Sequence, residues 1–196
     1  MTSEEPRRKS QAWLHFRRFL ARPRRVASLF ASSPRLARLI AGQIRRDRDD
    51  YVIEIGAGTG TVTGAILAAG IPADRLIAVE IDGAMADHVR ATYPGIRVLA
   101  CSAFDLKDTL PPEVRGRVGS VVCGIPIGLL PVARQRELAE TMMSLLRPGG
   151  QILAYAHRLT SPISAGGTRL VGRRLAFTLG NLPPASVWGY EPAAEG

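Results

Sequence analysis

Residues 51–60 read YVIEIGAGTG, an apolar run, Tyr51–Ile55, followed at once by three glycines at alternate positions, Gly56, Gly58 and Gly60. An apolar run of this length that ends in glycines is typical of a buried strand. The glycines allow the chain to turn sharply, and they let a ligand lie against bare backbone where the next helix begins. We expect that helix over residues 61–69. The stretch therefore predicts a strand, a glycine loop and a helix, the arrangement of a nucleoside-cofactor site.

Outward from this stretch, strand-like and helix-like segments alternate with short connections. The further strands are predicted at 75–81, 96–100, 118–123 and 151–156, and the further helices at 84–92 and 132–146. Such alternation predicts an α/β fold, a Rossmann-like, doubly wound and mostly parallel sheet. Two later runs, 169–179 and 185–190, predict an antiparallel pair at the edge of that sheet.

The positive charge is concentrated at the start of the chain. Of the 26 Lys and Arg residues, 13 lie in residues 1–48, together with three acidic residues. This segment therefore has a net charge of +10, and the rest of the chain has −1, which together give the net +9. We therefore divide the chain into a basic N-terminal helical extension, residues 1–48, and a domain of residues 49–196. A strongly basic segment favours an anionic partner, either nucleic acid or acidic phospholipid.

Within the extension, residues 10–21 (SQAWLHFRRFLA) have the periodicity of an amphipathic helix with an aromatic apolar side and an arginine-rich polar side. A helix that lies in a membrane interface has these two sides. The candidate membrane-binding residues are Trp13, Phe16, Arg17, Arg18, Phe19 and Leu20. Packing of the apolar side on the domain and contact with nucleic acid are the alternatives. A second helix is predicted from the N-cap Ser33 to about Arg46.

The sequence also limits the compartment. Two cysteines in apolar surroundings, Cys101 and Cys123, form no disulfide framework and lack metal-ligand spacing, so we predict a reducing compartment and no metal site. The N-terminus has no signal-peptide pattern, and the longest uncharged stretches are too short to span a bilayer. We expect a cytoplasmic protein.

The spacing of the glycines indicates the cofactor. The loop reads E-x-G-x-G-x-G, starting at Glu54, rather than the dinucleotide pattern G-x-G-x-x-G. An acidic residue before the glycines is favourable beside a sulfonium and repulsive beside a pyrophosphate. Glu80, at the end of the next predicted strand, is placed to accept hydrogen bonds from a ribose diol. The alternative for Glu54 is a strand-end residue satisfied by local hydrogen bonds.

This pattern resembles motif I of the class I S-adenosylmethionine-dependent methyltransferases. The resemblance implies S-adenosyl-L-methionine as cofactor and S-adenosyl-L-homocysteine as product. Gly56, Gly58 and Gly60 would then lie under the cofactor, Glu54 near its cationic end and Glu80 on its ribose hydroxyls. Such enzymes often have Asp in a G-D-A sequence that binds the adenine amino group, where this chain has Ser102. The adenine contact would come from the segment that contains Ser102, Ala103, Phe104 and Asp105, and Cys123 completes the predicted cofactor set.

The end of the fourth strand bears on the acceptor. In rRNA adenine dimethyltransferases, the sequence that corresponds to residues 124–127 has Asn in place of Gly124 and an aromatic residue in place of Ile127. A flipped base needs that amide and that stacking surface. Because both are absent, no nucleic acid is expected as partner.

The whole pattern resembles the small bacterial phospholipid N-methyltransferases of the PmtA type. The resemblance lies in residues 13–19, 33–37, 54–60, 78–80, 103–106, 124–126 and 146–149 and in the ending NLPPASVW, 181–188. It implies stepwise methylation of phosphatidylethanolamine, through mono- and dimethyl lipids towards phosphatidylcholine, at an anionic phospholipid surface on the inner face of the cell membrane. The alternatives are a class I methyltransferase acting on rRNA or protein, and a non-catalytic S-adenosylmethionine-binding protein.

Two residues at the end of the fifth predicted strand, Tyr155 and His157, are the candidate catalytic residues. The acceptor amine must lose a proton, and an imidazole is the side chain suited to take one near neutral pH. The backbone carbonyls around Cys123 and Gly124 are rivals for this role, and a structural or surface histidine is the alternative for His157.

Overall fold

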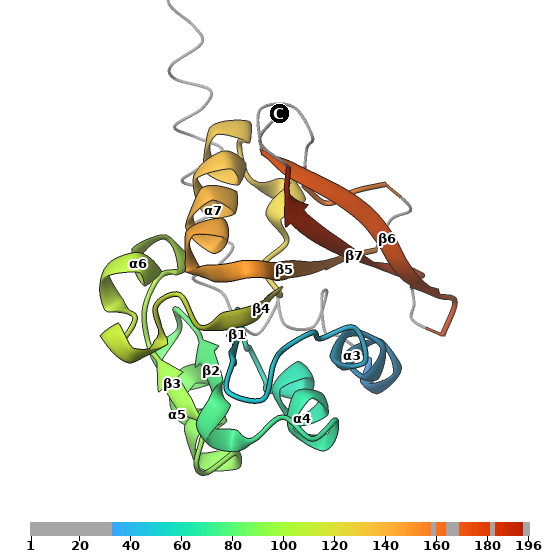
Figure 1. The fold of residues 1–196 in the computed structure, drawn as a ribbon. Helices are drawn as coiled ribbons and strands as arrows, with labels where there is room; N and C mark the ends of the chain where they lie inside the picture. The colour runs from blue at the N-terminus through green and yellow to red at the C-terminus, as the bar shows by residue number, and fades with distance from the viewer. Residues whose placement is uncertain (1–32, 158–159, 164–168, 181–182, 194–196) are drawn as a thin grey trace, which may run out of the picture.

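Seven strands form one mixed sheet in the order β3-β2-β1-β4-β5-β7-β6 (Figure 1). The computed structural model describes residues 33–157, 160–163, 169–180 and 183–193. The strands are β1 (Tyr51–Ile55), β2 (Leu76–Val79), β3 (Arg97–Leu99), β4 (Val118–Cys123), β5 (Leu146–Ala156), β6 (Leu170–Thr178) and β7 (Ala185–Pro192). The first five strands are parallel, whereas β7 is antiparallel to β5 and β6 is antiparallel to β7. The predicted Rossmann-like fold and its antiparallel edge are confirmed.

Helices cover both faces of the sheet. The α-helices are α3 (Pro34–Ala41), α4 (Thr61–Ala68), α5 (Gly83–Thr92), α6 (Leu106–Thr109) and α7 (Val132–Leu145), and the 3-10 turns are η1 (Ala73–Arg75), η2 (Ala103–Asp105), η3 (Pro112–Val114) and η4 (Ile127–Leu129). One face is covered by α3, α4 and α5 and the other by α6 and α7 (Figure 1). None of the described helices is both long and apolar enough to span a bilayer.

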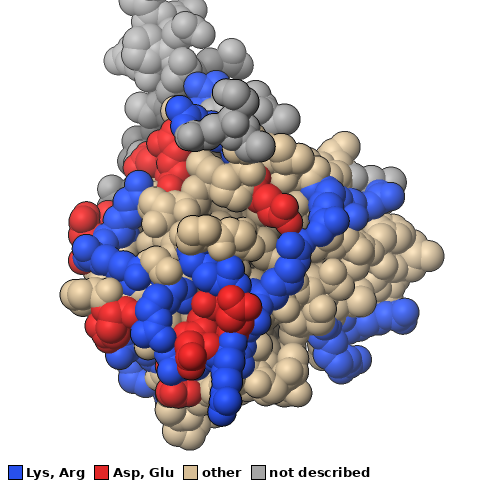
Figure 2. All heavy atoms as spheres, in the orientation of Figure 1, with Lys and Arg blue, Asp and Glu red and all other residues tan. Residues whose placement is uncertain are grey.

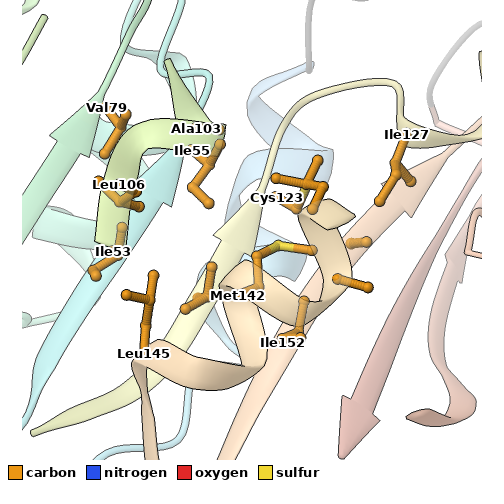
Figure 3. Close-up of a cluster of buried hydrophobic side chains, with 14 of the residues drawn as sticks. Ile53, Ile55, Val79, Ala103, Leu106, Cys123, Ile127, Met142, Leu145 and Ile152 are labelled. Carbon is orange, nitrogen blue, oxygen red and sulfur yellow. The ribbon is translucent and has the colours of Figure 1, made fainter. Parts of the chain in front are cut away.

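Alternating side chains of the strands build a core on each face. On β1, Ile53 and Ile55 point to the face of α6 and α7, where they join Leu106 and Met142 (Figure 3). Val52, the residue before Ile53, points to the opposite face and belongs to the core under α3 and α4. Because both faces are covered, the central parallel strands β1, β2 and β4 are buried along almost their whole length and are largely apolar. Burial of each such side chain contributes about 1.5–3 kcal/mol.

The helix α3 begins as predicted and ends earlier than predicted. The Ser33 hydroxyl caps it by accepting a hydrogen bond from the Leu36 amide at 3.2 Å. It ends at Ala41 rather than near residue 46, because the following chain is held by the sheet. The backbone of Arg45 donates to the Ser120 hydroxyl at 3.1 Å and accepts from it at 2.6 Å.

This helix is part of the folded domain. Leu36 and Ile40 are fully buried in the core that α3 shares with α4, β1 and β7. The described part of the predicted extension, from residue 33 on, therefore packs on the domain. The predicted helix over 10–21 lies outside the described residues, together with its candidate membrane-binding residues Trp13, Phe16, Arg17, Arg18, Phe19 and Leu20.

Candidate active site

The glycine loop connects β1 to α4 at the carboxyl edge of the sheet. Gly56, Gly58 and Gly60 have φ angles of 79°, 54° and 80°, which side chains strongly disfavour. The Gly56 amide donates to the Val79 carbonyl at 2.8 Å, and this bond ties the loop to β2. A Cβ atom built on Gly58 would meet no atom within 4 Å. The middle of the loop thus presents bare backbone to open space, as a bound cofactor needs.

Glu80 borders this loop from the end of β2. Its Oε2 accepts a hydrogen bond from the Gly58 amide at 2.9 Å, and its Oε1 accepts one from the Asp82 amide at 3.0 Å. A carboxylate has about four acceptor positions, so that about two remain. The carboxylate is therefore held rigidly at the loop and keeps the capacity to accept both hydroxyls of a ribose.

Glu54 lies underneath the loop rather than on its surface. Its side chain is 2% exposed, and Oε2 accepts a hydrogen bond from the Thr63 hydroxyl at 2.5 Å. Burial raises the pKa of Glu54 to about 8, against the lowering effect of the Thr63 bond, and the charge of Glu80 raises it further. At neutral pH this carboxyl is mostly protonated in the protein without ligand. A cation bound over the loop would favour its ionised form.

The last glycine of the loop, Gly60, contacts a tyrosine that was not predicted from the sequence. The Tyr93 hydroxyl donates to the Gly60 carbonyl at 2.9 Å. A Cβ atom on Gly60 would lie 2.6 Å from the Tyr93 ring, and one on Gly64 would lie 2.5 Å from its hydroxyl oxygen. Position 60, which also has a positive φ angle, therefore favours glycine strongly, and a side chain at position 64 would displace the Tyr93 hydroxyl. The signal in the sequence was Gly64 itself, a glycine within a predicted helix.

The predicted adenine segment forms η2 after β3. Ser102 caps this turn, its hydroxyl accepting from the Phe104 amide at 3.2 Å, and Ala103 is buried. The Arg134 guanidinium lies over the Phe104 ring, 3.6 Å from its centroid. One face of that ring is thus covered by Arg134, and the Ser102 hydroxyl retains its proton for donation.

Cys123 contributes its backbone position and not its side chain. The thiol is buried in the core beside Ile127 and Met142 (Figure 3), and burial raises its pKa to about 12. Strand alternation points the Cys123 side chain into the core, so the predicted cofactor contact of Cys123 stays a prediction for its backbone. The chain reaches the site one residue later, where the Gly124 amide donates to the Ile55 carbonyl at 2.8 Å.

A pocket of about 150 Å³ lies beside the loop at the carboxyl ends of β4 and β5. Its lining consists of Gly124, Pro126, Ile127, Gly128, Leu129, Tyr155, Ala156, His157 and Pro162. A Cβ atom on Gly124 would lie 2.9 Å from the Gly56 carbonyl oxygen and 3.2 Å from the Tyr155 hydroxyl oxygen. Gly124 therefore separates the cofactor loop from the pocket, and both candidate catalytic side chains line that pocket.

The geometry around His157 defines its basic nitrogen. Its Nδ1 lies 3.2 Å from the carbonyl oxygen of Pro183, which can only accept. In the neutral ring, Nδ1 therefore carries the proton and Nε2 is the basic nitrogen. Pro183 lies just before β7, so it orients the imidazole from 26 residues away. The sequence analysis did not connect the two.

Comparisons with known sequences agree with the loop and the fold. A family model described as a methyltransferase domain matches residues 52–150. An ornithine lipid N-methyltransferase from Singulisphaera acidiphila is 32% identical over 128 residues, covering 64% of this chain and 67% of the relative. A ribosomal RNA small subunit methyltransferase A from Thermotoga petrophila is 26% identical over 142 residues. That match covers 66% of this chain and 53% of the relative, so the chain matches only about half of the RNA enzyme's length.

Solved structures show the same fold at low sequence identity. A putative O-methyltransferase from Klebsiella pneumoniae superposes with a TM-score of 0.63 and 16% identity, covering 83% of this chain and 82% of that one. An amino pentose methyltransferase from Micromonospora echinaspora with S-adenosylmethionine bound superposes with a TM-score of 0.52 and 23% identity, covering 74% of this chain and 59% of that one.

Proposed function

Because the chain belongs to the methyltransferase-domain family and has the class I fold with S-adenosylmethionine as cofactor, we propose that it methylates the head-group amine of phosphatidylethanolamine at a membrane surface. The product series would run through the mono- and dimethyl lipids towards phosphatidylcholine. The protein would be bound peripherally to the inner face of the cell membrane.

The observation that carries this proposal is the pocket between the glycine loop and His157. Its volume of about 150 Å³ admits a small head group and leaves the rest of a lipid outside. The lining is largely apolar, and the described residues that form it include no carboxylate or amide side chain, so the pocket favours the neutral amine over the ammonium. Tyr155 and His157 supply the polar atoms that can hold or deprotonate that amine.

A lipid amine is also supported by one relative, the ornithine lipid N-methyltransferase. The ribosomal RNA methyltransferase relatives favour a second candidate, a base of rRNA. The backbone at Gly124 argues against it. An asparagine there, such as base-binding enzymes of this type have, would place its Cβ 2.9 Å from the Gly56 carbonyl oxygen. A contact this short with backbone requires the end of β1 or β4 to move.

In this proposal the chain's own residues act by position and proton transfer. When bound, S-adenosylmethionine supplies the electrophilic methyl group. Glu80 would hold the ribose hydroxyls, and the loop from Gly56 to Gly60 would hold the rest of the cofactor. The Tyr155 hydroxyl orients the amine, and His157 Nε2 takes its proton while Pro183 holds the ring. Alignment of the reacting atoms supplies most of the rate.

The test is incubation of the full chain with methyl-labelled S-adenosylmethionine and vesicles of phosphatidylethanolamine with phosphatidylglycerol, followed by thin-layer separation of the lipids. Parallel samples contain an ornithine lipid or 16S rRNA. Label in methylated phosphatidylethanolamine is the expected result. Label only in the ornithine lipid would correct the head group, and label only in RNA would refute a lipid acceptor.

Matched variants separate chemistry from binding. His157→Gln should lower the rate at least about tenfold while calorimetry finds the same affinity for S-adenosylmethionine, since loss of a general base costs about 10²–10⁴-fold. Deletion of residues 1–22 should weaken vesicle binding and leave cofactor affinity within a few-fold. Loss of both after the deletion would mean that the segment is part of the fold and not a membrane anchor.

A further inference from the structure

Exposed apolar side chains from two separate parts of the chain lie at or near the pocket. On one side, Leu129 and Val132 are 58% and 50% exposed, where η4 leads into α7. On the other side, Phe177 and Leu179 are 42% and 77% exposed, at the end of β6. We call these four residues the apolar rim. Exposed large apolar side chains grouped at a pocket mouth mark an interaction surface.

The strand register places the second half of the rim near the pocket. Ala156, which lines the pocket, pairs with Ser186 of β7, and Ser186 pairs with Phe177 of β6. Residues paired in this way lie on one face of the sheet, so Phe177 is two strand spacings, about 10 Å, from Ala156. Leu179 follows two residues later, past the end of β6. The carboxyl edge of the sheet thus extends from the pocket to this hairpin end.

Arginines accompany the apolar side chains there. Arg174 is exposed and pairs with Trp188, on the same face as Phe177. Arg35 of α3 lies against Gly180, with its Cδ 2.7 Å from where a Cβ of that glycine would stand. No acidic residue occurs between residues 169 and 180. Figure 2 shows the surface over β6 and β7 as mostly tan, with Lys and Arg at its margins.

We propose that the apolar rim is a bilayer-docking surface, with Leu129, Val132, Phe177 and Leu179 entering the acyl boundary and Arg35 and Arg174 contacting lipid phosphates. Apolar side chains bordered by arginines match the two layers of an anionic membrane interface. The inference rests on the proposed lipid acceptor, and it names a second contact besides residues 10–21. A pocket that admits only a head group requires the rim to face the bilayer, because the acyl chains of the substrate stay there.

The test places an environment-sensitive fluorophore on the full chain in a Cys101→Ser background, which leaves the buried Cys123 as native thiol. The label is attached to Leu179→Cys or, as matched control, to Val171→Cys. Val171 is 63% exposed near the start of β6, eight residues before Leu179 and roughly 25 Å away along the chain. With vesicles of equal phosphatidylethanolamine and phosphatidylglycerol, we expect a several-fold emission increase at 179, quenched by doxyl-labelled lipid, and little change at 171.

Three results would overturn the inference. One is vesicle binding without any response at 179, because the membrane contact would then lie elsewhere. Another is an equal response at 179 and 171. The third is a response at 179 that depends on protein concentration without vesicles, which would indicate a second copy of the chain as occupant.

Paired substitutions give an independent measurement. Phe177→Ser with Leu179→Ser should lower the vesicle partition coefficient about tenfold, whereas Val171→Ser should leave it within twofold. Calorimetric affinity for S-adenosylmethionine serves as the control for folding in both. An unchanged partition coefficient in a folded double variant refutes the surface. If the probe at 179 enters the membrane and no lipid is methylated, the proposed function fails and the docking surface stands. If lipid is methylated and the probe does not respond, the docking surface fails and the proposed function stands.

Discussion

Replacement of Glu54 by glutamine should stabilise the protein at neutral pH. The carboxyl is buried under the glycine loop and accepts one hydrogen bond from the Thr63 hydroxyl. Glutamine has the same shape and keeps that acceptor, but it carries no charge that burial would penalise. The variant therefore isolates the cost of ionising a carboxyl at this place.

The magnitude follows from the pKa of Glu54, raised from 4.5 to about 8 mainly by burial. Since the folded protein holds this proton more tightly than the unfolded chain, the stabilising effect is complete below pH 4.5 and is lost as pH rises to about 8. One pH unit in this window is worth up to about 1.4 kcal/mol. Relative to glutamine, the native carboxyl then costs less than about 1 kcal/mol at pH 5 and about 3 kcal/mol at pH 7.

The assay is urea unfolding of the wild type and Glu54→Gln at pH 5, 6, 7 and 8, without cofactor. The difference in free energy of unfolding should grow with pH in favour of the variant and level off above pH 8. Glu113→Gln is the control, because that exposed carboxyl has a lowered pKa from its own backbone and Arg97, and its removal should not stabilise the protein. A difference that stays constant between pH 5 and 8 would refute the reasoning.

Four further predictions concern the cofactor site. S-adenosylmethionine should bind more tightly as pH rises towards 8, because its sulfonium favours ionised Glu54. S-adenosylhomocysteine has a neutral thioether, so its affinity measured by calorimetry should change less with pH. An equal pH dependence of the two affinities would contradict this. Glu80→Ala should raise the Kd for S-adenosylmethionine at least about tenfold without changing vesicle binding. Tyr93→Phe should cost about 1 kcal/mol of stability and raise that Kd, because the bond to Gly60 is lost; an unchanged Kd would remove Tyr93 from the site. Gly124→Ala should lower stability by about 1–3 kcal/mol in urea unfolding, because of its contact with backbone.

The sequence was sufficient for features that depend on local chemistry. The three glycines of the loop have φ angles that only glycine adopts readily, so the pattern around Gly58 predicted the turn. The Ser33 cap and the Val118–Cys123 strand were likewise predicted from their own residues, and the structure has both. The antiparallel edge followed from two strand-like runs separated by prolines.

Features that depend on distant partners were not predictable from one sequence. The early end of α3 reflects a hydrogen-bond exchange between Arg45 and Ser120, 75 residues apart. The side of β4 on which the Cys123 thiol lies depends on how the strand packs against α7, and a strand buried on both sides gives no sign of that. The contact between His157 and Pro183 likewise needs the two ends of the β5–β7 pair to meet.

The strand directions explain why the chemistry and the proposed docking surface lie at one edge. In a parallel sheet, ligands bind beyond the carboxyl ends of the strands, and here those ends carry the glycine loop, Glu80 and the pocket. Because β7 is antiparallel to β5, it begins at the edge where β5 ends. Because β6 is antiparallel to β7, it ends at that edge, so the connection from β6 to β7 lies there too. Phe177 and Leu179 therefore lie beside the pocket as a result of topology alone. The proposed lipid, whose amine would enter the pocket while its acyl chains stay in the bilayer, would need apolar side chains at this edge. Three of the four rim residues, Leu129, Val132 and Leu179, are aliphatic and offer a nucleic-acid base no stacking surface.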